Sequence, residues 1–170
     1  DVNRFSREGG GWGYGGMSSD AVCVSASADV MLFGFALYTS RDSSMSATVS
    51  VKSGSGLFGG DPTNVLTETK VELTHGGEHP WKPVMFEAPV KMSAGSMYTL
   101  YTEISCGNSS GCGSGGNPVV TVADVTFNFS HSSQSRNGTD VQSGQIPDLF
   151  FLTCDEYERH TTSQSVTSKA

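Results

Sequence analysis

The sequence predicts an all-β protein, a single antiparallel β-sandwich of about ten strands with essentially no helix. Nearly every periodic segment alternates apolar and polar residues with a period of two. Turn-forming glycine, proline and asparagine pairs separate these segments at short intervals. No segment combines a sustained 3.6-residue period with capping residues. With 170 residues, the chain is long enough to bury one core.

The expected strands follow one another along the chain. A first strand begins at Asp20, and residues 30–38 (VMLFGFALY) are apolar on both faces, which predicts a strand covered on both sides. Gly34 interrupts this run and predicts a bulge or a close approach of a neighbouring backbone. Alternating segments then predict the remaining strands, and a short doubly apolar segment predicts the last one: residues 46–52, 65–73, 84–90, 97–104, 125–129 and 149–152.

Two segments are expected to lie outside the strands. Residues 106–117 (CGNSSGCGSGGN) have the low-complexity composition of a flexible loop. Residues 155–170 are polar and are expected to form a disordered C-terminal tail. The sequence therefore predicts one sandwich domain over residues 1–154.

Charge excludes two classes of partner. The formal net charge is −7, and the ten Lys and Arg residues form no run. Nonspecific binding to nucleic acid or to an anionic membrane needs a basic patch. No apolar run approaches the ~20 residues of a membrane span. We expect neither nucleic-acid binding nor membrane insertion.

Each motif that could carry chemistry lacks its structural context. The glycine sets 11/13/16 and 54/56/59 match G-x-G-x-x-G, but neither is expected to lie between a strand and a helix. Ser109 lies in a G-x-S-x-G match without the strand-to-helix turn of a nucleophile elbow. His75 and His79 flank a Gly-Gly turn, with no third metal ligand evident. We expect no catalytic residue, no metal site and no cofactor.

The four cysteines leave two environments open. An even count and sequons at Asn108, Asn128 and Asn137 are typical of a secreted, disulfide-bonded protein, in which Cys106 and Cys112 could close a loop. Against this, Cys23 lies mid-strand, where a buried free thiol is expected, and Asn128 also lies in a strand. These points favour an intracellular protein with reduced cysteines.

Trp12 and Tyr14 stand among six glycines in the segment Gly9–Gly16, the aromatic–glycine segment. Glycine allows unusual backbone conformations and close approach of neighbouring groups. Large aromatics in such a segment either anchor it to the core or meet a partner, because Trp and Tyr are enriched at interface hot spots. The two roles are compatible.

Five segments together resemble the PHR domain: residues 3–5 (NRF), 12–16 (WGYGG), 18–38, 82–100 and 137–151 (NGTDVQSGQIPDLFF). The resemblance covers residues 3–153. It implies an antiparallel β-sandwich that mediates protein interactions and has no catalytic activity of its own. PHR domains occur in the very large PAM/Highwire (Myc-binding protein 2 type) E3 ubiquitin ligases of neurons. They also occur in BTB-BACK-PHR substrate adaptors of cullin-3.

The resemblance to the PAM/Highwire type implies a cytoplasmic module, at the axon or synapse, that recruits a protein partner or substrate for ubiquitination. The ligase chemistry would reside elsewhere in the parent, and the isolated domain is expected to be monomeric. The alternatives are a BTB-BACK adaptor domain and a secreted, disulfide-bonded, lectin-like sandwich. We expect partner contacts from one end of the sandwich, through Arg4, Trp12, Tyr14, Asp20 and Gln145. Structural roles are expected for Phe5, Gly13 and Gly34.

Overall fold

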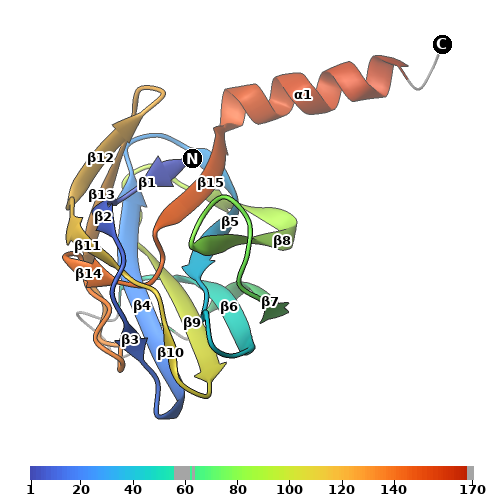
Figure 1. Ribbon diagram of the computed structural model, residues 1–170. Coiled ribbons are helices and arrows are strands. Elements are labelled where there is room, and N and C mark those ends of the chain that lie inside the picture. The colour runs from blue at the N-terminus through green and yellow to red at the C-terminus, as the bar shows by residue number, and fades with distance from the viewer. Residues whose placement is uncertain (56–61, 63, 168–170) are drawn as a thin grey trace.

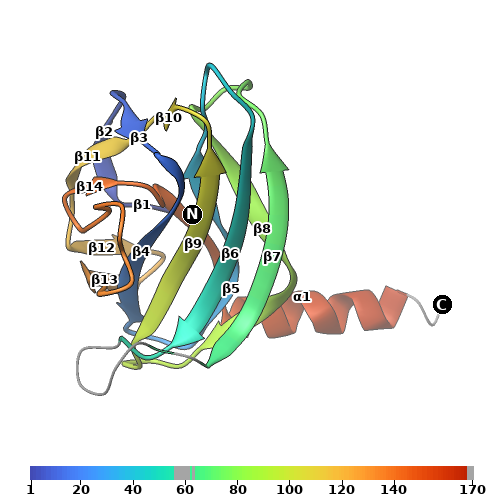
Figure 2. The ribbon, with the colours of Figure 1, turned by 90° about the horizontal axis from the view of Figure 1, so that it is seen from below.

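The computed structural model describes residues 1–55, 62 and 64–167, and it confirms the all-β sandwich. Two main antiparallel sheets pack face to face (Figures 1 and 2). The larger sheet has the order β12 (Val119–Val122), β13 (Val125–His131), β4 (Gly16–Ala26), β9 (Tyr98–Cys106), β6 (Met45–Ser53), β7 (Val65–Leu73). The smaller has the order β1 (Val2–Asn3), β15 (Asp148–Thr153), β5 (Val30–Tyr38), β8 (Trp81–Met92).

Short strands close one end of the sandwich. β14 (Ser143–Gly144), β11 (Gly113–Gly116) and β2 (Phe5–Glu8) form a three-stranded sheet. β3 (Trp12–Gly13) pairs with β10 (Ser109–Ser110). The described residues form fifteen strands rather than about ten, because seven strands of two to four residues add to the eight longer ones.

The core lies between the two main sheets. Alternate residues of each long strand point inward, as the period of two predicts. In β6, for example, Met45, Ala47, Val49 and Val51 are buried, and in β13 Val125, Phe127 and Phe129 are buried. β5 lies inside the smaller sheet between β15 and β8 and is buried at seven of its nine positions, in agreement with its apolar sequence.

Gly34 has both features expected of it. The register of β5 against β8 shifts between Leu32 and Gly34, which marks an irregularity of the bulge type. A Cβ atom on Gly34 would overlap the carbonyl oxygen of Val84 and would lie 2.9 Å from the Cα of Met85. Only glycine therefore fits between these two strands.

The expected flexible loop at residues 106–117 is instead largely ordered as β10 and β11. Its glycines serve close packing. A Cβ atom on Gly113 would overlap the ring of Phe5, and one on Gly116 would overlap the carbonyl oxygen of Val141. Composition alone does not distinguish glycines that permit flexibility from glycines that permit close packing.

The tail after Cys154 is not disordered over most of its length but forms α1 (Cys154–Thr167), which projects away from the sandwich (Figure 1). A capping box begins the helix: the Thr153 hydroxyl accepts from the backbone N–H of Glu156, and the Glu156 carboxylate accepts from the backbone N–H of Thr153. Tyr157 packs edge-on against Phe33 with ring centroids 6.0 Å apart. Neither α1 nor any other described segment is a helix of the length and hydropathy that crossing a bilayer requires.

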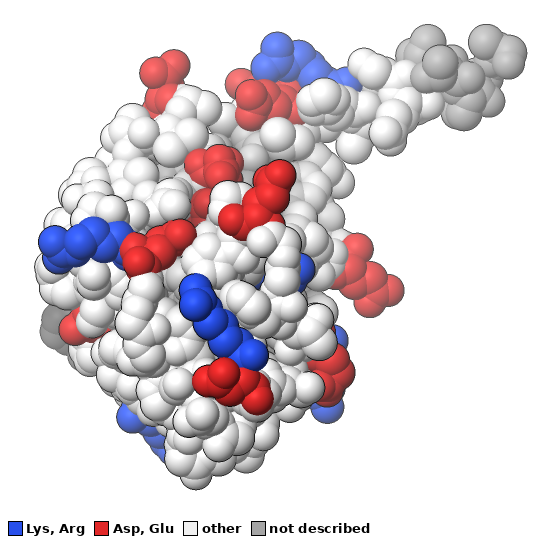
Figure 3. All heavy atoms as spheres, viewed as in Figure 1, with Lys and Arg blue, Asp and Glu red and all other residues white. Residues whose placement is uncertain are grey.

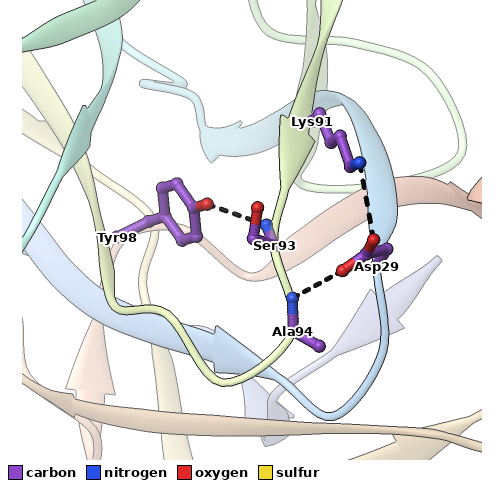
Figure 4. Close-up of polar contacts among 5 residues, drawn as sticks. All are labelled: Asp29, Lys91, Ser93, Ala94 and Tyr98. Atoms are coloured by element: carbon purple, nitrogen blue, oxygen red, sulfur yellow. Dashed lines mark hydrogen bonds and ion pairs between the residues drawn. The ribbon is translucent and has the colours of Figure 1, made fainter.

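A set of polar contacts ties two turns together at the end of the sandwich away from Gly16 (Figure 4). Asp29, in the turn between β4 and β5, accepts a 2.8 Å hydrogen bond from the backbone N–H of Ala94. The other carboxylate oxygen of Asp29 lies 3.4 Å from Nζ of Lys91. The Tyr98 hydroxyl accepts a 2.8 Å bond from the N–H of Ser93. These contacts hold the β8–β9 turn against the β4–β5 turn.

Candidate protein-interaction site

The carboxylate of Asp20 fixes the aromatic–glycine segment to the sandwich. The Tyr14 hydroxyl donates to Oδ2 at 2.5 Å, and the Trp12 indole N–H donates to Oδ1 at 3.2 Å. The hydroxyl of Thr139, from the segment before β14, donates to Oδ1 at 2.5 Å. Asp20 is fully buried, and three donors compensate for the cost of removing its carboxylate from water. Burial, together with the adjacent Asp20, raises the pKa of Tyr14 far above its ordinary value, so its hydroxyl remains a donor at neutral pH.

The side-chain amide of Gln145 connects this network to two strands. Its Oε1 accepts from the backbone N–H of Tyr38 at 2.8 Å, and its Nε2 donates to the hydroxyl of Ser110 at 2.7 Å. Its own backbone N–H donates to the Thr139 hydroxyl at 2.9 Å. Gln145 is fully buried, and the described contacts use both ends of its amide. The network therefore joins β4, β5 and β10 at one end of the sandwich.

Arg4 holds the turn that leads into β15. Its guanidinium donates to the carbonyl oxygens of Ile146 at 2.6 Å, Gln145 at 2.7 Å and Asp140 at 2.9 Å. Ile146 has a φ of 62°, a left-handed conformation that costs a side-chain-bearing residue about 1–2 kcal/mol. Arg4 is fully buried, and its guanidinium lies 4.0 Å from the ring centroid of Phe5. Burial lowers the pKa of Arg4 to about 9, which leaves the side chain charged at neutral pH.

The structure brings the five expected contact residues together but places most of them inside the protein. Arg4, Asp20 and Gln145 are fully buried, and Tyr14 is 6% exposed. Only Trp12 is partly exposed, and it packs against the core. Four of the five side chains therefore hold the backbone of the end loops and present no surface of their own to a partner.

The three residues expected to be structural differ in what they do. Phe5 is buried beneath the Arg4 guanidinium, and Gly34 fits tightly against β8. Gly13 is exposed, and a Cβ atom there would meet nothing within 4 Å. Its described role lies in its backbone, whose carbonyl oxygen accepts a 3.0 Å bond from the side chain of Asn137.

A pocket of about 280 Å³ opens beside this network, between the β5–β6 loop, the β7–β8 loop and β10. We call it the loop-end pocket. Gly9 and Gly10 of the aromatic–glycine segment line it, together with Arg41 and His75. Sequence reasoning missed Arg41 as a surface residue of this site, and it also missed Thr139 in the buried network. Neither has a local sequence signal, because loops distant in the chain bring them to the site.

The described parts of the glycine and histidine motifs lie in surroundings that do not match a nucleotide or metal site. No helix follows Gly16, since β4 begins there, and Gly56 and Gly59 lie outside the described residues. Nδ1 of His75 lies 3.0 Å from the Thr39 hydroxyl, while His79 stacks on Trp81. Among the described residues, no group of three His, Cys, Asp or Glu side chains is placed to hold a metal ion.

All four cysteines are free thiols in the structure. Cys23 is buried in β4, as its position in the strand pattern predicts, and Cys106 is buried at the end of β9. The Cys112 thiol donates to the carbonyl oxygen of Gly9 at 3.0 Å and so contacts the aromatic–glycine segment. The segment thus has contacts to β4 through Asp20 and to the β10–β11 connection through Cys112.

The chain is similar to known proteins over most of its length. Residues 3–152 match the family model of the PHR domain. The chain is 39% identical over 155 residues to the E3 ubiquitin-protein ligase MYCBP2 of Danio rerio, covering 88% of this chain and 3% of that protein. It is 35% identical over 165 residues to the E3 ubiquitin-protein ligase highwire of Drosophila melanogaster, covering 96% of this chain and 3% of that protein.

A second group of relatives consists of BTB/POZ proteins. BTB/POZ domain-containing protein 6 of Mus musculus is 34% identical over 140 residues, which cover 82% of this chain and 25% of that protein. The chain therefore spans a small part of each of these relatives. The region matched by the family model contains β2 to β14 and all five contact residues expected from sequence. The chain belongs to the PHR domain family.

Proposed function

We propose that this PHR domain is a non-catalytic recruiting module of an E3 ubiquitin ligase of the MYCBP2 and highwire type. It captures a protein partner or substrate through the loop end of the sandwich. One observation carries the proposal: a buried polar network around Asp20, Gln145 and Arg4 fixes the loops around the loop-end pocket. Loops held by a rigid scaffold are where binding residues concentrate.

The buried residues act by positioning in this proposal. Asp20 and its donors hold Gly9–Gly16, and Gln145 holds Ser110 and the end of β5. The partner meets what these contacts leave exposed, which includes Arg41 and the backbone of Gly9 and Gly10. The ubiquitin-transfer chemistry lies elsewhere in the parent protein, and the module acts in the cytoplasm of neurons.

The adaptor domain of a BTB protein remains the second candidate, because such proteins match over 82% of the chain. The two ligase relatives match over 88% and 96% of this chain, which favours the ligase module as the first candidate. The match to the PHR family supports both of these candidates over the lectin-like alternative.

The test substitutes exposed rather than buried residues. The wild-type domain and Arg41→Glu are used to capture proteins from neuronal lysate, with Arg136→Glu as a matched control of equal charge change outside the pocket. We expect a protein that the wild type and the control retain and Arg41→Glu loses, and its ubiquitination in cells should depend on the parent ligase. Identical capture by all three domains, with equal melting temperatures, would remove the loop-end pocket from the contact surface.

A further inference from the structure

A second depression, of about 450 Å³, lies at the N-terminal side of the sandwich. We call it the acidic–aromatic groove, and Phe5, Glu8, His79, Trp81 and Asp148 line it. Its lining includes no Lys or Arg side chain among the described residues, and the amino group of Asp1, which also lines the groove, is the positive charge that acts on the Asp148 carboxylate. Figure 3 shows acidic side chains on the face seen in Figure 1, with basic side chains between them.

Aromatic rings form one wall of the groove. The His79 and Trp81 rings are stacked, with centroids 4.3 Å apart and planes 4° from parallel. The Trp81 indole N–H donates to Oε1 of Glu8 at 3.1 Å, and the Tyr38 hydroxyl lies 3.5 Å from the same oxygen. These contacts fix the Glu8 carboxylate beside the indole. No described residue donates to its other oxygen, and Glu8 is exposed.

The carboxylate of Asp148 also lines the groove, and one of its oxygens lacks a partner. Asp148 is 1% exposed, and its Oδ1 accepts no hydrogen bond from the described residues. Leaving a buried acceptor unsatisfied costs about 1–3 kcal/mol, more for a charged group. A cation entering the groove would supply the missing donor. This second observation is independent of the exposed Glu8.

We propose that the acidic–aromatic groove binds an arginine side chain of the recruited polypeptide. A guanidinium presents five donors in a plane, stacks on aromatic rings and forms short charge-assisted bonds with carboxylates. The groove offers the matching features: the His79–Trp81 stack, the open oxygen of Glu8 and the unsatisfied oxygen of Asp148. This inference rests on the proposed recruiting function and specifies the chemistry of the partner segment.

The probe is the peptide acetyl-Gly-Gly-Arg-Gly-Gly-amide, whose blocked ends carry no charge. The chain has two tryptophans, so two indole N–H signals in an NMR titration report on two places: Trp81 on the groove and Trp12 on the network around Asp20. We expect saturable shifts of the Trp81 signal, with a dissociation constant on the order of 1 mM, and no shift of Trp12. The peptide with citrulline in place of arginine has the same shape without the charge and should not bind.

Matched variants separate a local site from the overall negative charge. Glu8→Gln should weaken binding at least fivefold, and Asp148→Asn should also weaken it. Glu87→Gln, an exposed residue of β8 outside the groove, should leave binding unchanged. Equal binding of the citrulline peptide, or equal weakening by Glu87→Gln, would overturn the proposal. A failed titration alongside Arg41-dependent capture would overturn the arginine preference alone and leave the recruiting function in place.

Discussion

Replacing Asp20 by alanine tests whether the buried network determines the structure of the loop end. The substitution removes the acceptor shared by Tyr14, Thr139 and Trp12. Tyr14 and Thr139 are buried, so neither hydroxyl can turn to bulk water without opening the structure. Trp12 is half-buried and is the easiest of the three to rehydrate.

The expected loss of stability follows from these contacts. A hydrogen bond to a charged group contributes about 1.5–3 kcal/mol, so two buried donors give about 3–6 kcal/mol for Asp20→Ala. The free energy of unfolding of a native protein is about 5–15 kcal/mol, so this loss would be a large part of the total. Asp20→Asn keeps one acceptor oxygen and should lose less than Asp20→Ala. Tyr14→Phe removes one of the two buried donors and should lose about 1.5–3 kcal/mol.

Urea unfolding followed by far-UV circular dichroism measures these differences. At about 2–4 °C of melting temperature per kcal/mol, Asp20→Ala should also melt roughly 6–24 °C lower. Asp42→Ala, in the exposed β5–β6 loop, is the control and should stay within about 0.5 kcal/mol of wild type. A loss below about 1 kcal/mol for Asp20→Ala would refute the reasoning, because the buried donors would then have found other partners.

Substitutions at three further sites have expected outcomes. Gly34→Ala should destabilise the protein by about 1–3 kcal/mol in urea unfolding, because the added Cβ atom overlaps the β8 backbone. Gly34→Glu should cost several kcal/mol, because it also buries a charge. Gly107→Ala is the control, since a Cβ atom there would meet nothing within 4 Å. Ala123 and Asp124 form the two-residue β12–β13 turn with φ of 51° and 62°, so replacing them by Asn-Gly should stabilise by about 1 kcal/mol, and an unchanged urea midpoint would contradict this. Burial raises the pKa of Asp148 from 3.8 to about 6, so the native state binds this proton more tightly than the unfolded chain. The stability that the protonated Asp148 carboxyl contributes to the native state is fully present below about pH 4 and is lost as the pH rises through about 6. Asp148→Asn should therefore remove that part of the decline in stability between pH 4.5 and 7, and a decline of unchanged size would contradict the assignment.

Strand positions can be predicted because their signal is local. The bounds expected for residues 30–38 and 65–73 are those of β5 and β7, since alternation of side chains between the two faces of a sheet is written in neighbouring residues. The irregularity at Gly34 is predictable because a glycine inside a doubly apolar strand usually marks a bulge or a close backbone approach. The α1 helix is not predicted, although the Thr153–Glu156 capping box is also local, because the polar composition after Cys154 is typical of a disordered tail.

The arrangement of the candidate site can be predicted only in part. The resemblance points to Arg4, Trp12, Tyr14, Asp20 and Gln145, and the structure brings all five together. Their burial cannot be predicted, because Arg4 reaches its carbonyl partners across more than 130 residues of chain. The glycines of residues 106–117 pose the same problem, since only their neighbours in space show that they permit close packing.

By itself, the sequence determined the β-sandwich class, the order of the long strands along the chain and the family, because period-two alternation and short motifs depend on residues close together in the chain. The tertiary structure decided which polar side chains are buried and hydrogen-bonded and which surfaces are exposed to solvent. It placed the Asp20 network inside the sandwich and left Arg41, Glu8 and the His79–Trp81 stack around two depressions. The physical reason is that burial and hydrogen-bond partners depend on strands that pair across the whole chain.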